Sequence, residues 1–321
     1  MRKILAIAVA AVLAVSTSAS ASVIIVRASV DRADLYVSEP SSAKSSPETQ
    51  SLYQVFSPEG QPARVEQTVL RFDCAAETFA VIEQVTFDES LHELKRNTVM
   101  DGPHPLPARM DFILEGKLGQ ACHRVSPPMP FVGRTETLPE AVTTSIKLMK
   151  LARMAPQYRK DIDARRRPTP LTSGGSWLVN PQGVGMGPSL MQIYEPPAIG
   201  SSDPTRVVYN VTVDANHQLD NIRRVTYRFD CAAKAYAQVE SIGLDSNLNV
   251  RGGRDQISPN AYPVEGMPKT IANYFLYADL CLGNHAIPAV QVAPDLKSAV
   301  AAAIAWAPDP EHPLSYPAGL P

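Results

Sequence analysis

The sequence predicts two similar α+β domains, each an antiparallel β-sheet followed by one or two helices and each with one internal disulfide. Three observations predict this fold class: a repeated segment, alternating apolar and polar residues within it, and four cysteines arranged in step with it. The chain has 321 residues, of which 45% are hydrophobic and 19% charged, so it can form a packed core. A prior of about 150 residues per domain also suggests two domains.

Residues 71–91 and 228–248 carry the repeat. They read RFDCAAETFAVIEQVTFDESL and RFDCAAKAYAQVESIGLDSNL, and they match without a gap at ten of 21 positions. Their spacing is much longer than the roughly 20–50 residues of solenoid repeats. The repeat therefore predicts a first domain over residues 22–155 and a second over residues 178–321.

The first 21 residues predict a secretory signal peptide. Arg2 and Lys3 precede a short apolar run, and Ala19-Ser20-Ala21 forms a cleavage pattern of small residues. A membrane anchor is the alternative, but the apolar run is shorter than the ~20 residues that span a bilayer. We therefore expect export to the periplasm or beyond, and no transmembrane segment in the mature chain.

Residues 156–177 separate the two predicted domains. They contain Arg165-Arg166-Arg167, several prolines and Gly174-Gly175, without apolar periodicity. This composition is typical of a linker. The three arginines could contact a polyanion, but a solvated connector is the favoured interpretation because the run is short and the chain is acidic.

Three strands are predicted in each copy from period-two alternation and from β-branched and aromatic residues. The second and third strands of each copy form a hairpin across a short turn. The strands are expected at residues 52–56, 70–74 and 79–87, and at residues 207–213, 225–231 and 236–244.

Helices are predicted late in each copy. Residues 140–154 lie between Pro139 and Pro156, and residues 295–306 lie between Pro294 and Pro308. Proline is common at the start of a helix and just beyond its end. A further helix is expected at residues 269–281, where apolar residues follow helical spacing.

Four cysteines allow three disulfide connectivities. Each copy has one cysteine on its central strand and another 48 or 50 residues later, so pairing within copies joins Cys74 to Cys122 and Cys231 to Cys281. Free buried thiols and a metal site are the alternatives. No cysteine has C-x-x-C spacing, which disfavours zinc, and an exported chain favours disulfides.

No catalytic motif stands out, and no cofactor or metal is predicted. A net charge of −2 argues against a nucleic-acid partner. None of the six histidines is matched between the copies or spaced for a shared ligand, so surface positions are the favoured interpretation. They are His92, His104, His123, His217, His285 and His312.

The polar residues kept in both copies form the candidate binding patch. They are Arg71, Asp73 and Glu83 in the first copy, and Arg228, Asp230 and Glu240 in the second. As a functional site they would form a charged recognition surface on the hairpins. The alternative, which we favour, is a cross-strand ion pair that sets register, with Glu83 opposite Arg71.

The pattern from Phe72-Asp73-Cys74-Ala75 to Cys122, and from Phe229-Asp230-Cys231-Ala232 to Cys281, resembles surface-adhesin protein E-like domains of bacterial envelopes. The resemblance covers about 60 residues per copy. It implies a small disulfide-bonded α+β domain in the cell envelope and, by analogy with the family's namesake, adhesion to host proteins. The chain differs in having two copies, a helix after the second cysteine and no lipobox.

Three functional hypotheses follow from the sequence. The first is an exported, non-enzymatic envelope protein that binds a macromolecular partner, because tandem domains can gain avidity. The second is an envelope hydrolase with a site in one copy or between the copies, for which His123, His285 and Asp279 are candidates. The third is a structural or assembly factor of the envelope.

Overall fold

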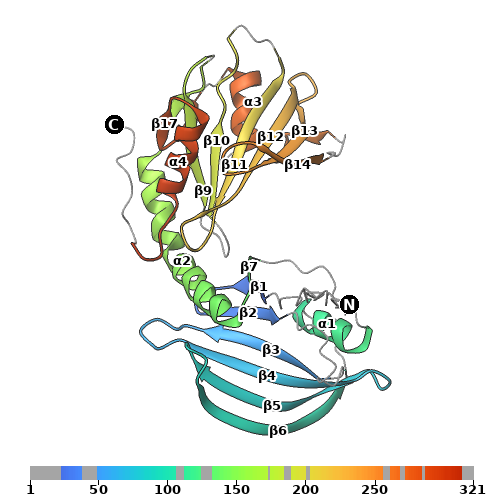
Figure 1. The fold of residues 1–321 in the computed structure, drawn as a ribbon. Coiled ribbons are helices and arrows are strands. Elements are labelled where there is room, and N and C mark those ends of the chain that lie inside the picture. The colour runs from blue at the N-terminus through green and yellow to red at the C-terminus, as the bar shows by residue number, and fades with distance from the viewer. Residues whose placement is uncertain are drawn as a thin grey trace, which may run out of the picture.

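The computed structural model describes most of the chain. The described residues are 23–37, 49–105, 112–123, 132–172, 174–183, 189–199, 203–255, 261–267, 272–283 and 286–312. The predicted signal peptide lies outside them. Two large antiparallel β-sheets dominate the described part, and four α-helices accompany them. Figure 1 shows the two sheets near opposite ends of the long helix α2.

The first sheet has the strand order β6-β5-β4-β3-β2-β1-β7, and each neighbouring pair is antiparallel. Consecutive strands are neighbours from β1 to β6, and the chain then returns to pair β7 with β1. The strands are β1(Val23–Ala28), β2(Arg32–Val37), β3(Thr49–Phe56), β4(Arg64–Asp73), β5(Thr78–Asp88), β6(Glu93–Pro105) and β7(Gly133–Thr135).

The second sheet repeats this order as β14-β13-β12-β11-β10-β9-β17, with β15 added beside β13. A separate two-stranded sheet pairs β8 with β16. The strands are β8(Arg167–Pro170), β9(Trp177–Gly183), β10(Ser189–Tyr194), β11(Thr205–Val213), β12(Leu219–Asp230), β13(Ala235–Leu244), β14(Val250–Asp255), β15(Tyr262–Pro263), β16(Ala286–Ala289) and β17(Gln291–Ala293).

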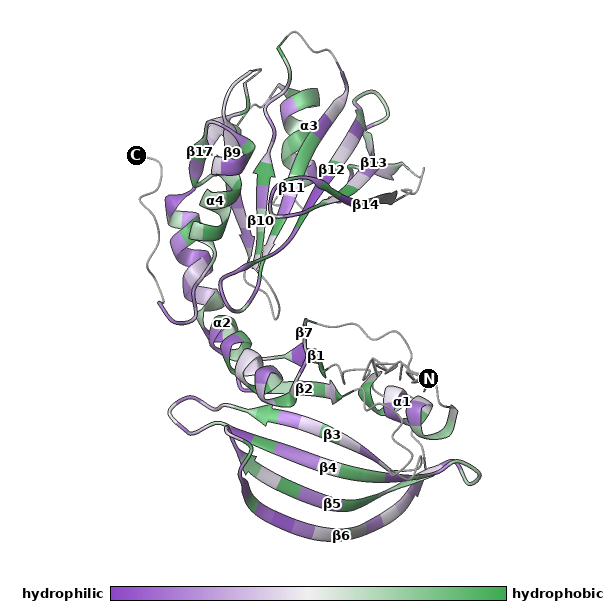
Figure 2. Cartoon of the chain, viewed as in Figure 1, coloured by the Kyte–Doolittle hydropathy of each residue, from purple (hydrophilic) through white to green (hydrophobic). Residues whose placement is uncertain are grey.

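The three predicted strands of each copy are confirmed as β3–β5 and β11–β13. Figure 2 shows alternating hydrophobic and hydrophilic residues along several of these strands, the pattern that predicted them. The hairpins β4–β5 and β12–β13 also share a β-bulge, at Val69/Leu70 and at the equivalent Thr226/Tyr227. The sequence analysis missed the first two strands of each sheet, the edge strands β6 and β14, and the short strands β7, β8, β15, β16 and β17.

Two helices occur in each half, one on either side of the short returning strand. The first half has α1(Phe112–Leu118), which continues as the π-helix η1(Gly119–His123), and then α2(Leu138–Arg165). The second half has α3(Ala272–Leu282) and α4(Leu296–Trp306). Asp295 caps α4 by accepting a hydrogen bond from the Ser298 backbone N–H, which confirms the predicted start of this helix. No helix in the described part of the chain is long and apolar enough to cross a membrane.

The predicted end of the helix at Met154 and the irregular linker at 156–177 are wrong. Helix α2 continues through Pro156 to Arg165, and β8 follows almost at once. A proline inside a helix costs about 3 kcal/mol. Burial of Tyr158 and Ile162 beyond Pro156 offsets this cost, because both side chains lie on the apolar face that Leu151 and Ala155 begin.

The arginine triplet is also more than a solvated connector. The Arg166 guanidinium donates to the side chain of Asn180 at 3.0 Å and to the Pro181 backbone carbonyl, both in β9. Arg165 and Arg167 donate to backbone carbonyls at the end of α2. Arg166 therefore fastens the end of α2 to the second sheet, and the predicted boundary at residue 155 falls inside a helix shared by both halves.

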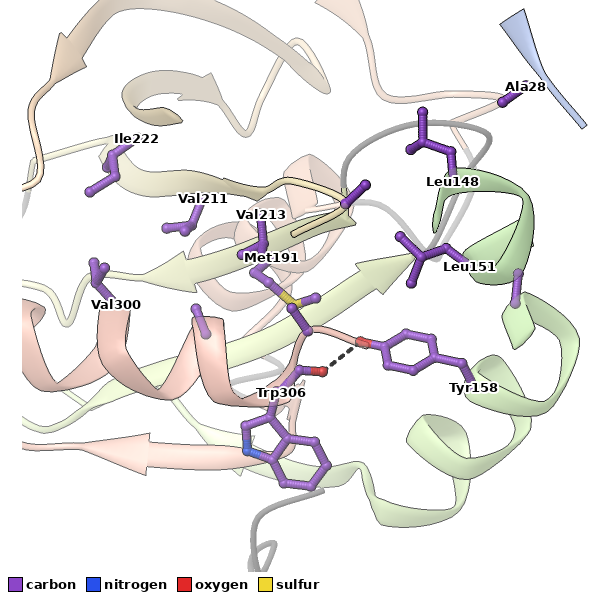
Figure 3. Packing of buried hydrophobic residues seen from close by; sticks show 14 of the residues in the cluster. Ala28, Leu148, Leu151, Tyr158, Met191, Val211, Val213, Ile222, Val300 and Trp306 are labelled. Atoms are coloured by element: carbon purple, nitrogen blue, oxygen red, sulfur yellow. Dashed lines mark hydrogen bonds between the residues drawn. The ribbon is translucent and has the colours of Figure 1, made fainter. Parts of the chain in front are cut away.

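One hydrophobic cluster joins the two sheets through α2. It contains Ile25 and Leu35 of the first sheet, Leu151 of α2, and Met191 of the second sheet, all fully or almost fully buried. The Tyr158 hydroxyl donates to the backbone carbonyl of Trp306 at 3.0 Å, which connects α2 to the end of α4 (Figure 3). Whether each half folds alone stays a prediction.

Candidate functional site

The hairpin residues that repeat between the copies serve mainly local structure. The Asp73 carboxylate accepts backbone N–H bonds from Ala75 and Ala76 at 3.1 and 3.0 Å, and Asp230 accepts one from Ala233 at 2.8 Å. Such bonds from an aspartate to its own turn favour the turn conformation. Asp73 and Asp230 are therefore kept because they build the β4–β5 and β12–β13 turns.

Glu83 and Glu240 form ion pairs, but not with the repeated arginines. Glu83 accepts from Arg96 of β6 at 2.6 Å, whereas Glu240 accepts from Arg224 of β12 at 2.8 Å. The predicted opposition of Glu83 and Arg71 is wrong. The hairpin turn pairs Asp73 with Thr78, so Arg71 faces Ala80, and beyond the shared bulge Glu83 faces Val69.

Arg71 and Arg228 are the two repeated residues of the patch that remain exposed without a structural role in the described contacts. They hold equivalent positions, opposite the identical residues Ala80 and Ala237. Each follows a strand alternation that places it on the face away from the buried Phe72 or Phe229. Both sheets thus present one guanidinium group at the same place.

The repeated residues Asp88 and Asp245 build a second kind of turn. Each carboxylate accepts two backbone N–H bonds, from Ser90 and His92 at 2.9 Å and from Asn247 and Asn249 at 2.8 Å. The backbone bond from His92 holds the pKa of Asp88 below its ordinary value, and the bond from Asn249 does the same for the pKa of Asp245. The identity of these residues between the copies also follows from turn structure.

Both predicted disulfides are present. Cys74 joins Cys122, and Cys231 joins Cys281. The cysteines Cys74 and Cys231 lie in the turn after the central strand, not on the strand as predicted. Each disulfide therefore ties a hairpin tip to the helical segment that crosses the same face of its sheet.

A charged cluster in the first half was missed by the sequence analysis. The Asp34 carboxylate on β2 is 3% exposed and accepts from Arg27 of β1 at 2.7 and 3.0 Å and from Gln54 of β3 at 2.9 Å. Arg32 completes the cluster, with its guanidinium 3.3 Å from Asp34. The signal for this cluster was a charged residue within the apolar run of β2, but β2 itself was not predicted.

The cluster lines a cavity of about 220 Å³ between the sheet and α1. Arg27, Arg32, Asp34 and Gln54 form one end of the cavity. The other lining residues are Leu52, Tyr53, Leu70, Phe79, Ile113 and Leu114. An outer hollow of about 400 Å³ shares Arg27 and Arg32 with this cavity and is otherwise lined by Ser29, Asp31 and Phe56.

Helix α1 is held over β2 by two polar contacts. The buried Lys117 ammonium donates to the Val37 backbone carbonyl at 2.8 Å and lies 4.6 Å from the centre of the Tyr36 ring. The Tyr36 hydroxyl donates to the Gly116 carbonyl at 3.4 Å. These contacts place Ile113 and Leu114 as the roof of the cavity.

Of the residues considered for hydrolysis, Asp279 is the one whose side chain the structure describes. Asp279 is buried on α3 and pairs with Arg206 of β11 at 3.1 Å. His285 and the side chain of His123 lie outside the described residues. Within the described ranges, no three His, Cys, Asp or Glu side chains are grouped so that they could hold a metal ion.

No protein-family model, no curated protein and no solved structure matches this chain.

Proposed function

We propose that the chain is an exported envelope protein made of two copies of one α+β domain, and that it binds an acidic macromolecular partner without catalysing a reaction. The duplication is supported by the two sheets, which run through the same strand order with a shared bulge. Disulfides are typical of oxidising compartments, which supports export. The resemblance to adhesin E-like domains favours the same location.

The exposed pair Arg71 and Arg228 carries this proposal. The other repeated polar residues of the hairpins build turns or ion pairs within the sheets. Arg71 and Arg228 do neither in the described contacts, yet both copies keep them at the same register position. Two equivalent guanidinium groups on one chain could bind a partner with repeated acidic groups and gain avidity.

Charge reversal tests the proposal. Immobilised protein is compared with the Arg71→Glu, Arg228→Glu and doubly reversed variants for capture of acidic macromolecules from envelope extract and from host extracellular material. We expect the double variant to lose more capture than either single variant, because two sites act together.

Exposed Lys95 of β6 and Lys297 of α4 offer a matched control. The Lys95→Glu/Lys297→Glu variant changes net charge by the same amount and should retain capture. Thermal unfolding must be equal in all variants. Equal capture by the wild type and the Arg71/Arg228 double variant would remove these arginines as the site, and turnover in a hydrolase screen would favour the enzyme hypothesis.

A further inference from the structure

We propose that the cavity beneath α1 binds a small free carboxylate that carries an apolar chain. This site is separate from Arg71 and Arg228, and it does not depend on the macromolecular partner. The cavity has a charged end at Arg27, Arg32 and Asp34 and an apolar end at Leu52, Leu70 and Phe79. This polarity fits an amphipathic ligand that enters with its chain first.

At the charged end, the guanidinium groups are more exposed than the carboxylate that they contact. The Arg27 and Arg32 side chains are 55% and 39% exposed, whereas Asp34 is 3% exposed. The buried Asp34 carboxylate therefore holds both arginines through its contacts with their guanidinium groups. Two guanidinium groups face one carboxylate, so the inner site has an excess positive charge that a carboxylate headgroup would neutralise. Guanidinium groups bind carboxylates with paired hydrogen bonds.

Arg32 is the better placed of the two arginines for this contact. Arg27 makes bonds of 2.7 and 3.0 Å to Asp34, while the approaches of Arg32 to Asp34 are both 3.3 Å. Arg27 and Arg32 both line the cavity and the outer hollow, so the weaker hold of Asp34 on Arg32 is what distinguishes them. Arg32 can therefore turn toward a headgroup at the opening while Arg27 remains bound to Asp34.

Asp31 is the acidic residue that lines the outer hollow, and its negative charge would repel an anionic headgroup there. It is exposed and accepts from the Ser29 hydroxyl at 3.3 Å. Asp31 lines only the outer hollow, whereas both arginines also line the inner cavity. The inner pair of arginines should therefore dominate, and a cationic amphiphile is the competing outcome that the experiment must separate.

The apolar end limits the size of the ligand. Leu52, Leu70, Phe79 and Leu114 belong to or pack against the small hydrophobic cluster around Phe72. The cavity of about 220 Å³ is smaller than the roughly 300–1,000 Å³ of sites for drug-sized ligands. A medium-length acyl chain suits this space better than a two-chain lipid.

The second half has larger side chains at the positions equivalent to two residues that line the cavity. At the constant offset of the repeat, Leu70 and Phe79 correspond to Tyr227 and Tyr236. These two tyrosine rings lie 6.1 Å apart, and each also contacts Phe229. Burial raises the pKa of Tyr227 to about 12. The first half thus has a smaller residue, leucine, at a position that a tyrosine occupies in the second.

The ligand arms of the experiment use calorimetric titration of the mature protein with octanoate, octylammonium and acetate. Octanoate should bind with one site per chain. Octylammonium has the same chain but the wrong charge, and acetate has the headgroup without the chain, so both should bind at least tenfold more weakly. Vesicles of anionic phospholipid test whether the site binds a lipid headgroup instead of a free carboxylate. They should not compete with octanoate.

The variant arms exchange residues between the halves. Leu70→Tyr should reduce octanoate affinity at least tenfold by filling the cavity, whereas the reciprocal Tyr227→Leu should leave it unchanged. Arg32→Leu should lower the affinity for octanoate relative to the wild type. Arg224→Gln in the second sheet should leave this affinity unchanged.

Several results would overturn the proposal. They are no octanoate binding, equal binding of octylammonium or acetate, two sites per chain, or binding of vesicles alone. The ligand arms need no variant, so the proposal stays testable even if Leu70→Tyr does not fold.

Discussion

The two halves of the molecule share a strand order but differ at one row across their first three strands. In the first sheet, Arg27 pairs with Asp34 and Asp34 with Gln54. The equivalent row of the second sheet is Asn180, Gln192 and Asn210. The equivalence follows from the register, because Gln54 faces Glu66 and Asn210 faces Arg223, which match at the constant offset of the repeat.

This comparison separates residues that preserve the fold from residues that distinguish the halves. The repeated aspartates and cysteines form turns and disulfides in both halves. The row at Asp34 is charged in one half and neutral in the other. Gln192 donates to Asn210 at 3.3 Å and accepts from the Tyr194 hydroxyl at 3.2 Å. The Asn180 side chain accepts from Arg166, which lies outside the row. Identity of the aspartates and cysteines between the copies therefore follows from structure, whereas divergence marks the candidate small-molecule site.

Removing a disulfide is expected to have a large effect on stability. The loops closed by Cys74–Cys122 and Cys231–Cys281 span 48 and 50 residues. In the chain-entropy model, loss of either disulfide lowers the free energy of unfolding by up to ~4 kcal/mol. Paired serine variants in each half, compared by urea unfolding, should lose similar amounts. Unequal losses would show that the halves depend on their disulfides differently.

The next effect tests whether the halves are coupled through α2. Leu151 is fully buried in the cluster that contains residues of both sheets. Leu151→Ala should cost about 2–5 kcal/mol, because the cavity it leaves removes packing from the shared core. Fluorescence and circular dichroism should report the same lowered unfolding transition. Exposed Lys160 provides the control, and Lys160→Ala should have little effect.

Separate transitions, with only one shifted by Leu151→Ala, would contradict this coupling. They would instead support the two independent domains that the sequence analysis predicted. Limited proteolysis between residues 165 and 177 gives the complementary test. Because Arg166 and β8 fasten this segment to the second half, stable separated halves are not expected from the structure.

The neutral row of the second half suggests a third test. Asp34→Gln places in the first half the residue that the second half uses. We expect a loss of about 2 kcal/mol, since hydrogen bonds to a charged group contribute roughly 1.5–3 kcal/mol. Urea unfolding measures the change, and Asp31→Asn at the exposed neighbour is the control. No loss would mean that Arg27 and Gln54 are as well satisfied by an amide.

The repeat and the alternation of apolar residues were sufficient to predict the hairpins, the helix at 296–306 and both disulfides. Strand β2 was not predicted, because it is buried on successive residues and lacks a period-two pattern. Pro156 misled the assignment of α2, since proline usually ends a helix. Only tertiary burial of Tyr158 and Ile162 explains why this helix continues.

The candidate sites were predictable to different degrees. Arg71 and Arg228 were found because they repeat, but the partners of Glu83 and Glu240 depended on where each hairpin turns, which the sequence did not determine. The cluster at Asp34 could not be found from repetition, because its residues differ between the copies. Its members come together only when β1, β2 and β3 pair, which places Arg27, Asp34 and Gln54 side by side.

A smaller effect is expected from the ion pairs of the repeated glutamates. Glu240 and Arg224 are 24% and 32% exposed, and such pairs contribute less than about 1 kcal/mol. Arg224→Ala should lower stability within that limit, and the loss should shrink in high salt. In the Glu83–Arg96 pair both side chains are more exposed than in the Glu240–Arg224 pair. Arg96→Ala should therefore lower stability by no more than Arg224→Ala does. A larger loss for either variant would assign these pairs a structural role beyond register.

The smallest effect concerns pH and should be the same in both halves. Backbone hydrogen bonds hold the pKa values of Asp88 and Asp245 below the ordinary value of 3.8. A carboxylate with a lowered pKa contributes stability that is present above its unfolded pKa and lost as pH falls through its folded pKa. Asp88→Asn and Asp245→Asn keep an accepting oxygen but remove the charge. Each variant should therefore lose a little stability at neutral pH and show a weaker decline in acid below about pH 4.

Urea unfolding at several pH values measures how steeply stability declines in acid. Because the two turns make the same pair of backbone bonds, the variants should flatten this decline equally. A change in slope for only one of them would show that the two copies have diverged at this turn as they have at Asp34.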